Sequence, residues 1–277
     1  TLEHVGRTEA IIGDWMARRG TRGRIVLATK GVGRTGPQSW DEGASRKHLL
    51  DAVDASLKRL RTDHVDLYQL HHDDRTTPLD EALEALATIV RSGRARYVGV
   101  SNFYAWRVAK ALGLCALLSL PRIVCLQPRY NLLFRQPERE LFPLVEEEGL
   151  GVIAYNPLAG GLLTGKHAAA SDAPVAGSRF GMPNRAAEMY KDRYWHEREF
   201  ETVAALRDEA ARAGLPLARM AIAWVLANPA ITSAIVGASR AAQLDDSLAA
   251  ATLTLEPGLQ GRLDALTASY RMGDAPR

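Results

Sequence analysis

Several short apolar runs of the sequence end in, or are followed by, a residue whose side chain could take part in chemistry. These side chains are an ammonium, an imidazole, a hydroxyl, three amides and a phenol: Lys30, His71, Ser101, Asn102, Gln127, Tyr155 and Asn156. Lysine and histidine can hold or move a proton, while amides both donate and accept hydrogen bonds. If the runs are parallel strands, these groups meet at the edge where α/β proteins place their sites.

The apolar runs have the pattern of strands that are buried on both faces. We expect strands at residues 24–29, 65–70, 97–100, 123–126, 152–155 and 234–236, most of them separated by the length of one β-α unit. Helical patterns fill the gaps. Ser45 is a plausible N-cap for one helix, Thr77 is the expected N-cap of a second with Pro78 in its first position, and a third lies between Pro216 and Pro229.

This alternation predicts an α/β protein with either an open doubly wound sheet or a closed barrel. No linker or shift of composition divides the chain, so we expect one domain over residues 1–277. The interval before the last strand is the exception to the regular spacing, with a polar stretch punctuated by glycine and proline and then two helices; we take residues 157–195 as its long loop. A loop of that length is usually functional, and we expect it to cover cofactor or substrate.

The composition is that of an ordinary globular protein. A net charge of +3 with scattered basic residues gives no reason to expect nucleic acid as a partner, and no apolar run is long enough for a bilayer. We expect a cytoplasmic location, a small-molecule partner and no membrane partner, and leave the oligomeric state open. Cys115 and Cys125 lack metal-site spacing and are expected to be buried apolar residues.

Two glycine-rich segments resemble nucleotide-binding motifs. Residues 31–36 read G-x-G-x-x-G, but the next helix starts only near Ser45, whereas a Rossmann fingerprint opens a helix at once. Residues 160–166 are close to a P-loop, but His167 stands where a serine or threonine must hold magnesium. Neither motif is accepted, although a glycine turn that ends in Lys166 suits a phosphate.

Single residues also have structural explanations. His71, His72, Asp73 and Asp74 could suggest a metal, but adjacent extended residues point oppositely and no further histidine completes a set, so no metal is expected. A lysine after a strand is often solvated, and glutamine or asparagine can cap a helix. The case for a site depends on all of these groups occurring at strand ends together.

The segments in question resemble the aldo-keto reductase superfamily. They are residues 25–30, 66–71 with 77–79, 99–102, 126–127 with 130–131, 154–160 with 163–166, and 237–244. The similarity is greatest to the bacterial branch that also resembles the potassium-channel β subunits. The resemblance implies a parallel (β/α)8 TIM barrel that reduces an aldehyde or ketone with NADPH. We place six strands, so we expect the first two, with the catalytic tyrosine and aspartate, upstream of residue 1.

The resemblance also implies the roles of individual residues. Lys30 would lower the pKa of the catalytic tyrosine, and His71 would orient the substrate carbonyl. The nicotinamide carboxamide would be held by Ser101, Asn102 and Gln127, with Tyr155 stacked on the ring. The pyrophosphate would be lined by Asn156, Leu158, Gly160 and Lys166, with Arg179 closing over it. The adenosine 2′-phosphate would be surrounded by Gly237, Ser239, Arg240 and Gln243. The adenine would contact Asp246 and Ser247. Asp246 and Ser247 replace the family's usual Glu-Asn pair.

Two other functions stay open. A Schiff-base aldolase on the same barrel would use Lys30 as its nucleophile. A cofactor-binding regulatory subunit with little turnover would keep the same residues.

Overall fold

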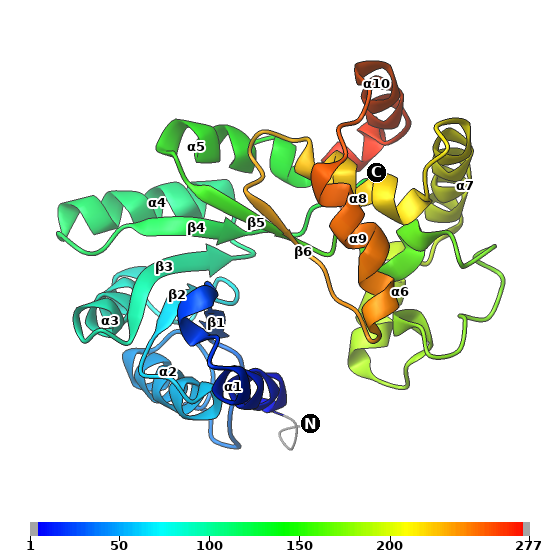
Figure 1. Cartoon of the computed structure of the whole chain (residues 1–277). Helices are drawn as coiled ribbons and strands as arrows, with labels where there is room; N and C mark the ends of the chain where they lie inside the picture. Colours follow the sequence, from blue (N-terminus) through cyan, green and yellow to red (C-terminus); the bar gives the residue numbers. More distant parts are fainter. Residues whose placement is uncertain (1–4, 274–277) are drawn as a thin grey trace. The chain divides into compact units, whose positions relative to one another are not determined.

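The computed structural model describes residues 5–273, and the chain forms two compact units, Thr1–Gln127 and Pro128–Arg277 (Figure 1). The expectation of a single domain stays a prediction. Each unit is described by itself below.

The first unit alternates strands and helices in a regular order. It consists of α1 (Arg7–Arg19), the 3-10 helix η2 (Arg22–Arg24), β1 (Ala28–Gly31), α2 (Arg46–Leu60), β2 (Val65–Leu70), α3 (Leu79–Arg91), β3 (Ala95–Ser101), α4 (Ala105–Leu117) and β4 (Ile123–Gln127). The four strands pair in parallel and in chain order. Helices α2, α3 and α4 lie along one side of them (Figure 1). The predicted parallel α/β class is confirmed.

The two faces of this sheet have different environments. The Tyr68 hydroxyl lies 3.5 Å from the Leu49 carbonyl oxygen of α2, so Tyr68 faces the helices. Side chains alternate along a strand, which puts Gln69 on the opposite face. Lys30 is the register partner of Gln69. Lys30 and Gln69 therefore share the face of the sheet that the helices do not cover.

Most predicted element boundaries in this unit hold, and two are wrong. Ser45 caps α2 as predicted, its hydroxyl accepting from His48 N at 3.3 Å. The first strand begins at Ala28 rather than at residue 24, because η2 occupies Arg22–Arg24. Helix α3 has Pro78 rather than Thr77 in its N-cap position. The Thr77 hydroxyl instead donates to Asp74 Oδ2 at 2.7 Å.

The second unit contains two parallel strands and several helices. Its elements are η3 (Gln136–Glu138), α5 (Leu141–Glu148), β5 (Gly151–Tyr155), η4 (Ala159–Thr164), η5 (Arg179–Gly181), α6 (Arg185–Tyr194), α7 (Glu197–Arg212), α8 (Leu217–Leu226), β6 (Ser233–Ile235), η6 (Ala241–Leu244), α9 (Asp245–Ala249), η7 (Ala250–Thr252), α10 (Pro257–Leu266) and η8 (Ala268–Met272). Strand β5 pairs with β6 in parallel. The helix predicted between Pro216 and Pro229 is α8.

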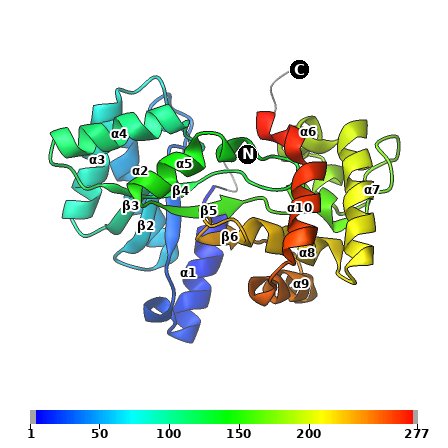
Figure 2. The same ribbon diagram turned by 90° about the horizontal axis from the view of Figure 1, so that it is seen from above.

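The core of the second unit is built around Trp224 of α8. Its ring stacks on Tyr130 with centroids 5.1 Å apart, and its Nε1 donates to Asp264 Oδ1 of α10 at 3.0 Å. Arg135 ties the same region together through Glu138 and Asp264. Figure 2 shows α7, α8 and α10 gathered beside β5 and β6. These contacts fix the helices that follow the long segment 157–195.

Two smaller expectations can be compared with the structure. Cys115 and Cys125 are both buried with free thiols, as expected. Within residues 5–273, no helix is both long and apolar enough to cross a membrane.

Candidate active site

The side chain of Lys30 in β1 reaches the opposite edge of the four-stranded sheet. Its Nζ donates to Gln127 Oε1 at the end of β4, 2.9 Å away. In a flat sheet β1 and β4 would lie about 14 Å apart, with side chains standing perpendicular to it. A direct bond between them requires the sheet to curve around this face. Lys30 is half-buried there, and burial lowers its pKa.

Three more of the predicted residues join this arrangement through hydrogen bonds. Ser101 Oγ, at the end of β3, donates to the Gln127 carbonyl oxygen at 2.8 Å. Asn102 Nδ2 donates to the His71 carbonyl oxygen at 3.2 Å and to Ser101 Oγ at 3.1 Å. Asn102 has a left-handed φ of 56°, which asparagine tolerates better than most residues. The carboxyl ends of all four strands are thus bonded into one cluster.

The electrostatics of this cluster keep His71 neutral. Partial burial lowers its pKa to about 4, and the positive charges of Lys30 and His72 act in the same direction. By its accessible surface His71 is exposed, so water screens much of this depression. At neutral pH one ring nitrogen carries a proton and the other does not. His71 can therefore donate a hydrogen bond to an oxygen while Lys30 supplies positive charge nearby.

The two aspartates after His71 have structural roles. Asp73 accepts from Arg107 Nε at 3.0 Å and from Arg75 Nε at 2.9 Å. Asp74 accepts from Ala44 N at 2.7 Å and from the hydroxyls of Thr76 and Thr77. Among residues 5–273, no group of three His, Cys, Asp or Glu side chains is arranged to hold a metal ion.

The sequence analysis missed Gln69, the register partner of Lys30. Its side chain is completely buried, and neither amide atom has a hydrogen-bond partner among the described residues. The available signal was a polar residue that shares one face of the strand with the apolar Val65 and Leu67. Gln69 is therefore a buried amide on the strand next to Lys30, on the same face of the sheet.

In the second unit, Tyr155 ends β5 and Asn156 turns the chain with a φ of 63°. Burial raises the pKa of Tyr155, and the positive charges of Arg193 and Arg129 oppose this rise. Asn156 Oδ1 accepts from Gly160 N at 2.7 Å, and its Nδ2 donates to the Tyr194 hydroxyl at 2.9 Å.

Two residues that were not predicted hold Asn156 in place. Asn131 Nδ2 donates to the Asn156 carbonyl oxygen and to the Tyr194 hydroxyl, both at 3.0 Å. Asn131 and Tyr194 are completely or almost completely buried. Tyr194 is the last residue of α6, so the strand end and this helix are bonded to each other.

The segment after Asn156 is a tight glycine turn. Leu158 O accepts from Gly161 N at 2.8 Å, and Gly160 and Gly161 have φ angles of 72° and 105°. A Cβ on Gly160 would lie 2.8 Å from the Tyr190 ring, and one on Gly161 would lie 3.7 Å from Lys166 Nζ. Both glycines lie within η4, and no α-helix follows before α6, whereas a P-loop leads directly into a helix. Lys166 therefore lies beside the backbone of Gly161, which has no side chain, and a cation next to such backbone fits an anion.

Arg179 lies further along the same segment, in η5. Its Nη1 donates to the Tyr190 hydroxyl at 2.9 Å, and its guanidinium lies 4.9 Å from the centre of that ring. Since Tyr190 also flanks Gly160, Arg179 is linked to the glycine turn through one aromatic ring.

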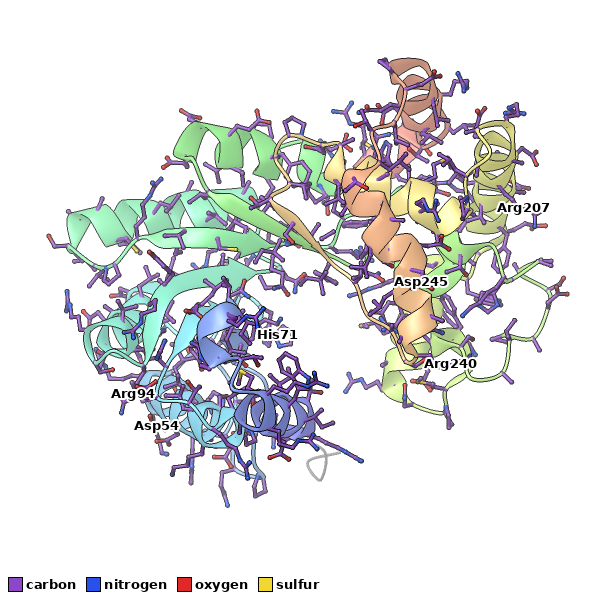
Figure 3. All side chains as sticks on the ribbon, in the orientation of Figure 1. Asp54, His71, Arg94, Arg207, Arg240 and Asp245 are labelled. Atoms are coloured by element: carbon purple, nitrogen blue, oxygen red, sulfur yellow. The ribbon has the colours of Figure 1, made fainter. Side chains whose placement is uncertain are left out.

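The group predicted to meet the 2′-phosphate is exposed between β6 and α9. Gln243 Oε1 accepts from Ser239 N at 2.9 Å and from Ser239 Oγ at 3.1 Å. Arg240 N approaches the same oxygen at 3.4 Å. Gly237 lies just before them and is also exposed. Figure 3 labels Arg240, which directly precedes η6, and Asp245, the first residue of α9.

Asp246 and Ser247, the predicted adenine contacts, lie in α9. Asp246 Oδ1 accepts from Arg219 Nη2 at 2.9 Å, with both side chains partly exposed. The carboxylate is therefore already paired with an arginine of α8, and Ser247 beside it is half-buried.

Comparison with known proteins identifies the family to which this chain belongs. The model of the Aldo/keto reductase family matches residues 4–268. This chain belongs to that family. The resemblance stated from the sequence is confirmed, and membership makes the chain an oxidoreductase of the aldo/keto reductase type.

Relatives of this aldo/keto reductase include enzymes and channel subunits. It is 40% identical over 260 residues to "Uncharacterized oxidoreductase YrpG" of Bacillus subtilis (strain 168), covering 92% of this chain and 76% of the relative. It is 36% identical to "Probable voltage-gated potassium channel subunit beta" of Arabidopsis thaliana, covering 88% and 74%. It is 34% identical to "L-glyceraldehyde 3-phosphate reductase" of Escherichia coli (strain K12), covering 83% and 65%. The predicted similarity to channel β subunits is confirmed.

Proposed function

We propose that this aldo/keto reductase uses NADPH to reduce an aldehyde or ketone to an alcohol. The observation that carries the proposal is the hydrogen-bonded cluster at the carboxyl ends of β1 to β4, which gathers Lys30 and His71 on one edge of a parallel sheet. Both groups have lowered pKa values. Perturbed titratable groups of this kind are typical of catalytic sites.

The proposed roles of Lys30 and His71 follow from the charge that the reaction develops. A carbonyl oxygen gains negative charge as hydride reaches its carbon, and that oxygen must then be protonated. Neutral His71 would donate a hydrogen bond to the oxygen and hold it in position. The Lys30 ammonium would stabilise the developing charge and the ionised form of the acidic tyrosine that the family resemblance implies.

The cofactor would lie along the residues that the resemblance names. Bound NADPH would supply the hydride. Ser101, Asn102 and Gln127 offer amide and hydroxyl groups for a carboxamide, and Tyr155 offers a ring for stacking. Lys166 beside the glycine turn fits a pyrophosphate, because a cation and open backbone both favour an anion. Arg179 would close over it.

Selectivity for NADPH over NADH is proposed from the segment 237–243. Ser239 and Gln243 are already bonded to each other, and Arg240 stands exposed beside them. This combination supplies a cation and polar donors for a phosphate.

We also propose that the strands belong to a (β/α)8 barrel. The sheet curvature that the Lys30–Gln127 bond requires supports this proposal. The cytoplasmic location stays a prediction.

Two observations favour other functions. One relative carries the name of a potassium channel subunit, so a regulatory subunit that binds NADPH with little turnover is a second candidate. The lowered pKa of Lys30 would also suit a Schiff-base nucleophile. The bond from Lys30 Nζ to Gln127 argues for a held cation instead.

One set of measurements separates these three candidates. The natural protein would be incubated with NADPH and an aromatic aldehyde, and the loss of NADPH absorbance followed. A reductase consumes NADPH and forms the alcohol in equal amounts. Tight NADPH binding without turnover of a range of aldehydes and ketones would point to the regulatory subunit. Borohydride trapping of a substrate on Lys30 would point to the aldolase.

A further inference from the structure

A group of charged and aromatic side chains stands on the loop that follows β2 and at the start of α4, which follows β3. It consists of Asp73, Arg75, Tyr104, Trp106 and Arg107, and is called the Arg75 cluster here. The Arg75 guanidinium lies 5.6 Å from the centre of the Tyr104 ring and 5.1 Å from that of Trp106. Both rings are exposed, by 59% and 51%. The sequence analysis assigned no role to Arg75.

The cluster fixes one end of the Arg75 guanidinium and leaves the other end open. Asp73 is almost buried and uses one oxygen for Arg107 Nε and the other for Arg75 Nε. Within residues 5–273, the terminal amino groups of Arg75 have no hydrogen-bond partner, and its side chain is 54% exposed. The two aromatic rings and Asp73 thus hold a partly exposed guanidinium whose terminal amino groups are available to a ligand.

The Arg75 cluster is close along the chain to the residues proposed for the reaction. Arg75 follows His71 by four residues, and Tyr104 follows Asn102 by two. Four residues of extended chain span at most about 14 Å. Both segments leave the carboxyl ends of their strands, so the cluster and the reacting carbonyl are on the same edge of the first unit. The separation suits two ends of one small molecule.

We propose that Arg75 binds the anionic group of the substrate, so that the preferred substrates are aldehydes or ketones carrying a carboxylate or a phosphate. A planar guanidinium with two free amino groups matches the two oxygens of such groups. This inference rests on the proposed reductase function. It adds to that function a substrate class and a residue that selects it.

A purely structural role for the Arg75 cluster makes a different prediction. If Arg75 only ties the two segments together, its removal lowers stability and affects all substrates alike. If it binds an anion, its removal acts on anionic substrates alone. The ratio of kcat/KM for an anionic substrate to that for a neutral analogue separates these roles, because a general effect on folding or on hydride transfer cancels in the ratio.

The test compares matched substrates and matched variants. Formylbenzoate is compared with its methyl ester, and formylphenyl phosphate with its dimethyl ester. The variants are Arg75→Gln, Arg75→Lys and Arg94→Gln. Arg94 is the matched control, because it also pairs with an aspartate, Asp54, at 2.7 Å, and Figure 3 shows this pair away from His71.

We expect the natural protein to favour at least one anionic substrate by about tenfold or more, the size of a charge-assisted contact. Arg75→Gln should bring the ratio near one, Arg75→Lys should keep part of it, and Arg94→Gln should leave it unchanged. Added salt should lower the ratio. The larger of the two ratios identifies carboxylate or phosphate as the preferred group. A natural protein indifferent to charge, or a ratio that survives Arg75→Gln, would overturn the proposal.

A binding measurement keeps the proposal testable if no substrate turns over. Calorimetry would compare benzoate with benzamide, neither of which can be reduced here. Tighter binding of benzoate that is lost in Arg75→Gln supports the anion site even if the reductase function fails. Equal binding of the two compounds, or benzoate binding that Arg75→Gln leaves intact, counts against it.

Discussion

Lys30 Nζ in β1 and Gln127 Oε1 in β4 are joined by a 2.9 Å hydrogen bond although two strands lie between them in the sheet. The bond places an ammonium group at the centre of the strand ends rather than in solvent. Lys30→Met and His71→Ala should therefore each remove most turnover, while the NADPH dissociation constant changes by no more than a few-fold. Steady-state kinetics and fluorescence titration of the natural protein measure both quantities. Near-normal kcat in either variant would remove that residue from the proposed mechanism.

The titration of His71 should depend on Lys30. Burial and then the Lys30 charge lower the His71 pKa from 6.5 to about 4, so Lys30→Met should move it back toward 6.5. The histidine ring signals in NMR spectra report this pKa, and the His71→Gln variant assigns the signal. An unchanged His71 pKa in Lys30→Met would show that the two groups do not interact.

The same shift makes stability depend on pH. The folded pKa of His71 lies below its unfolded value, so protonation favours the unfolded chain. The His71 contribution to the free energy of unfolding should decline as pH falls from about 6.5 to about 4 and then level off. Urea unfolding of the natural protein and His71→Gln in that range isolates this slope. Parallel pH profiles for the two proteins would contradict it.

Arg240→Ala should remove much of the preference for NADPH over NADH. A charge-assisted contact contributes about 1.5–3 kcal/mol, or roughly tenfold or more in the ratio of dissociation constants. Arg207 in α7 is a suitable control because it is also exposed and lies away from Arg240 in Figure 3. Arg207→Ala should leave the ratio intact. Equal affinity of the unmutated protein for both cofactors would refute the phosphate site itself.

Two glycines of segment 157–195 offer a pair of substitutions that separates backbone strain from crowding. Gly160 and Gly177 have nearly equal φ angles, 72° and 71°, but a Cβ would contact Tyr190 at Gly160 and nothing at Gly177. Alanine at Gly177 should cost about 1–2 kcal/mol of unfolding free energy from strain. Alanine at Gly160 should cost about 1–3 kcal/mol more from crowding, and should weaken NADPH binding. Equal losses in urea unfolding would show that Tyr190 moves aside freely.

The buried amide of Gln69, next to Lys30 in the sheet, can be tested by substitution. Its two amide atoms have no partner in the described structure, and a buried group without hydrogen bonds is costly. Gln69→Met should raise the free energy of unfolding by about 1 kcal/mol or more. The same substitution at Gln127, whose Oε1 is bonded to Lys30, should lower it. A loss of stability in Gln69→Met would mean that its amide is hydrogen-bonded in solution.

The sequence was sufficient for the features that depend on local pattern. The strand predicted at residues 65–70 has those bounds in the structure, and Ser45 caps its helix as expected. The prediction from local pattern was wrong where a neighbouring side chain or turn competes with the expected element. The hydroxyl of Thr77 is taken by Asp74, which displaces the expected cap, and η2 shortens the first strand.

For the site, residue types at strand ends identified Lys30, His71, Ser101, Asn102 and Gln127, which the structure bonds into one cluster. They could not reveal the partners that occupy Asp73, because Arg107 lies 34 residues away. Nor could they reveal Gln69, whose importance depends on its register with Lys30 rather than on any motif. The roles of the cofactor residues stay predictions.

The bonds from Tyr194 to Asn131 and Asn156 fasten the final residue of α6 to the end of β5. Segment 157–195 is thereby anchored at both ends, since Asn156 precedes it and Tyr194 lies at its close. A rearrangement of the segment that kept these bonds would be confined to the residues between the two anchors. For the proposed cofactor role, we therefore expect dinucleotide exchange to need a change in the residues beside Asn156 and Tyr194 rather than detachment of the whole segment.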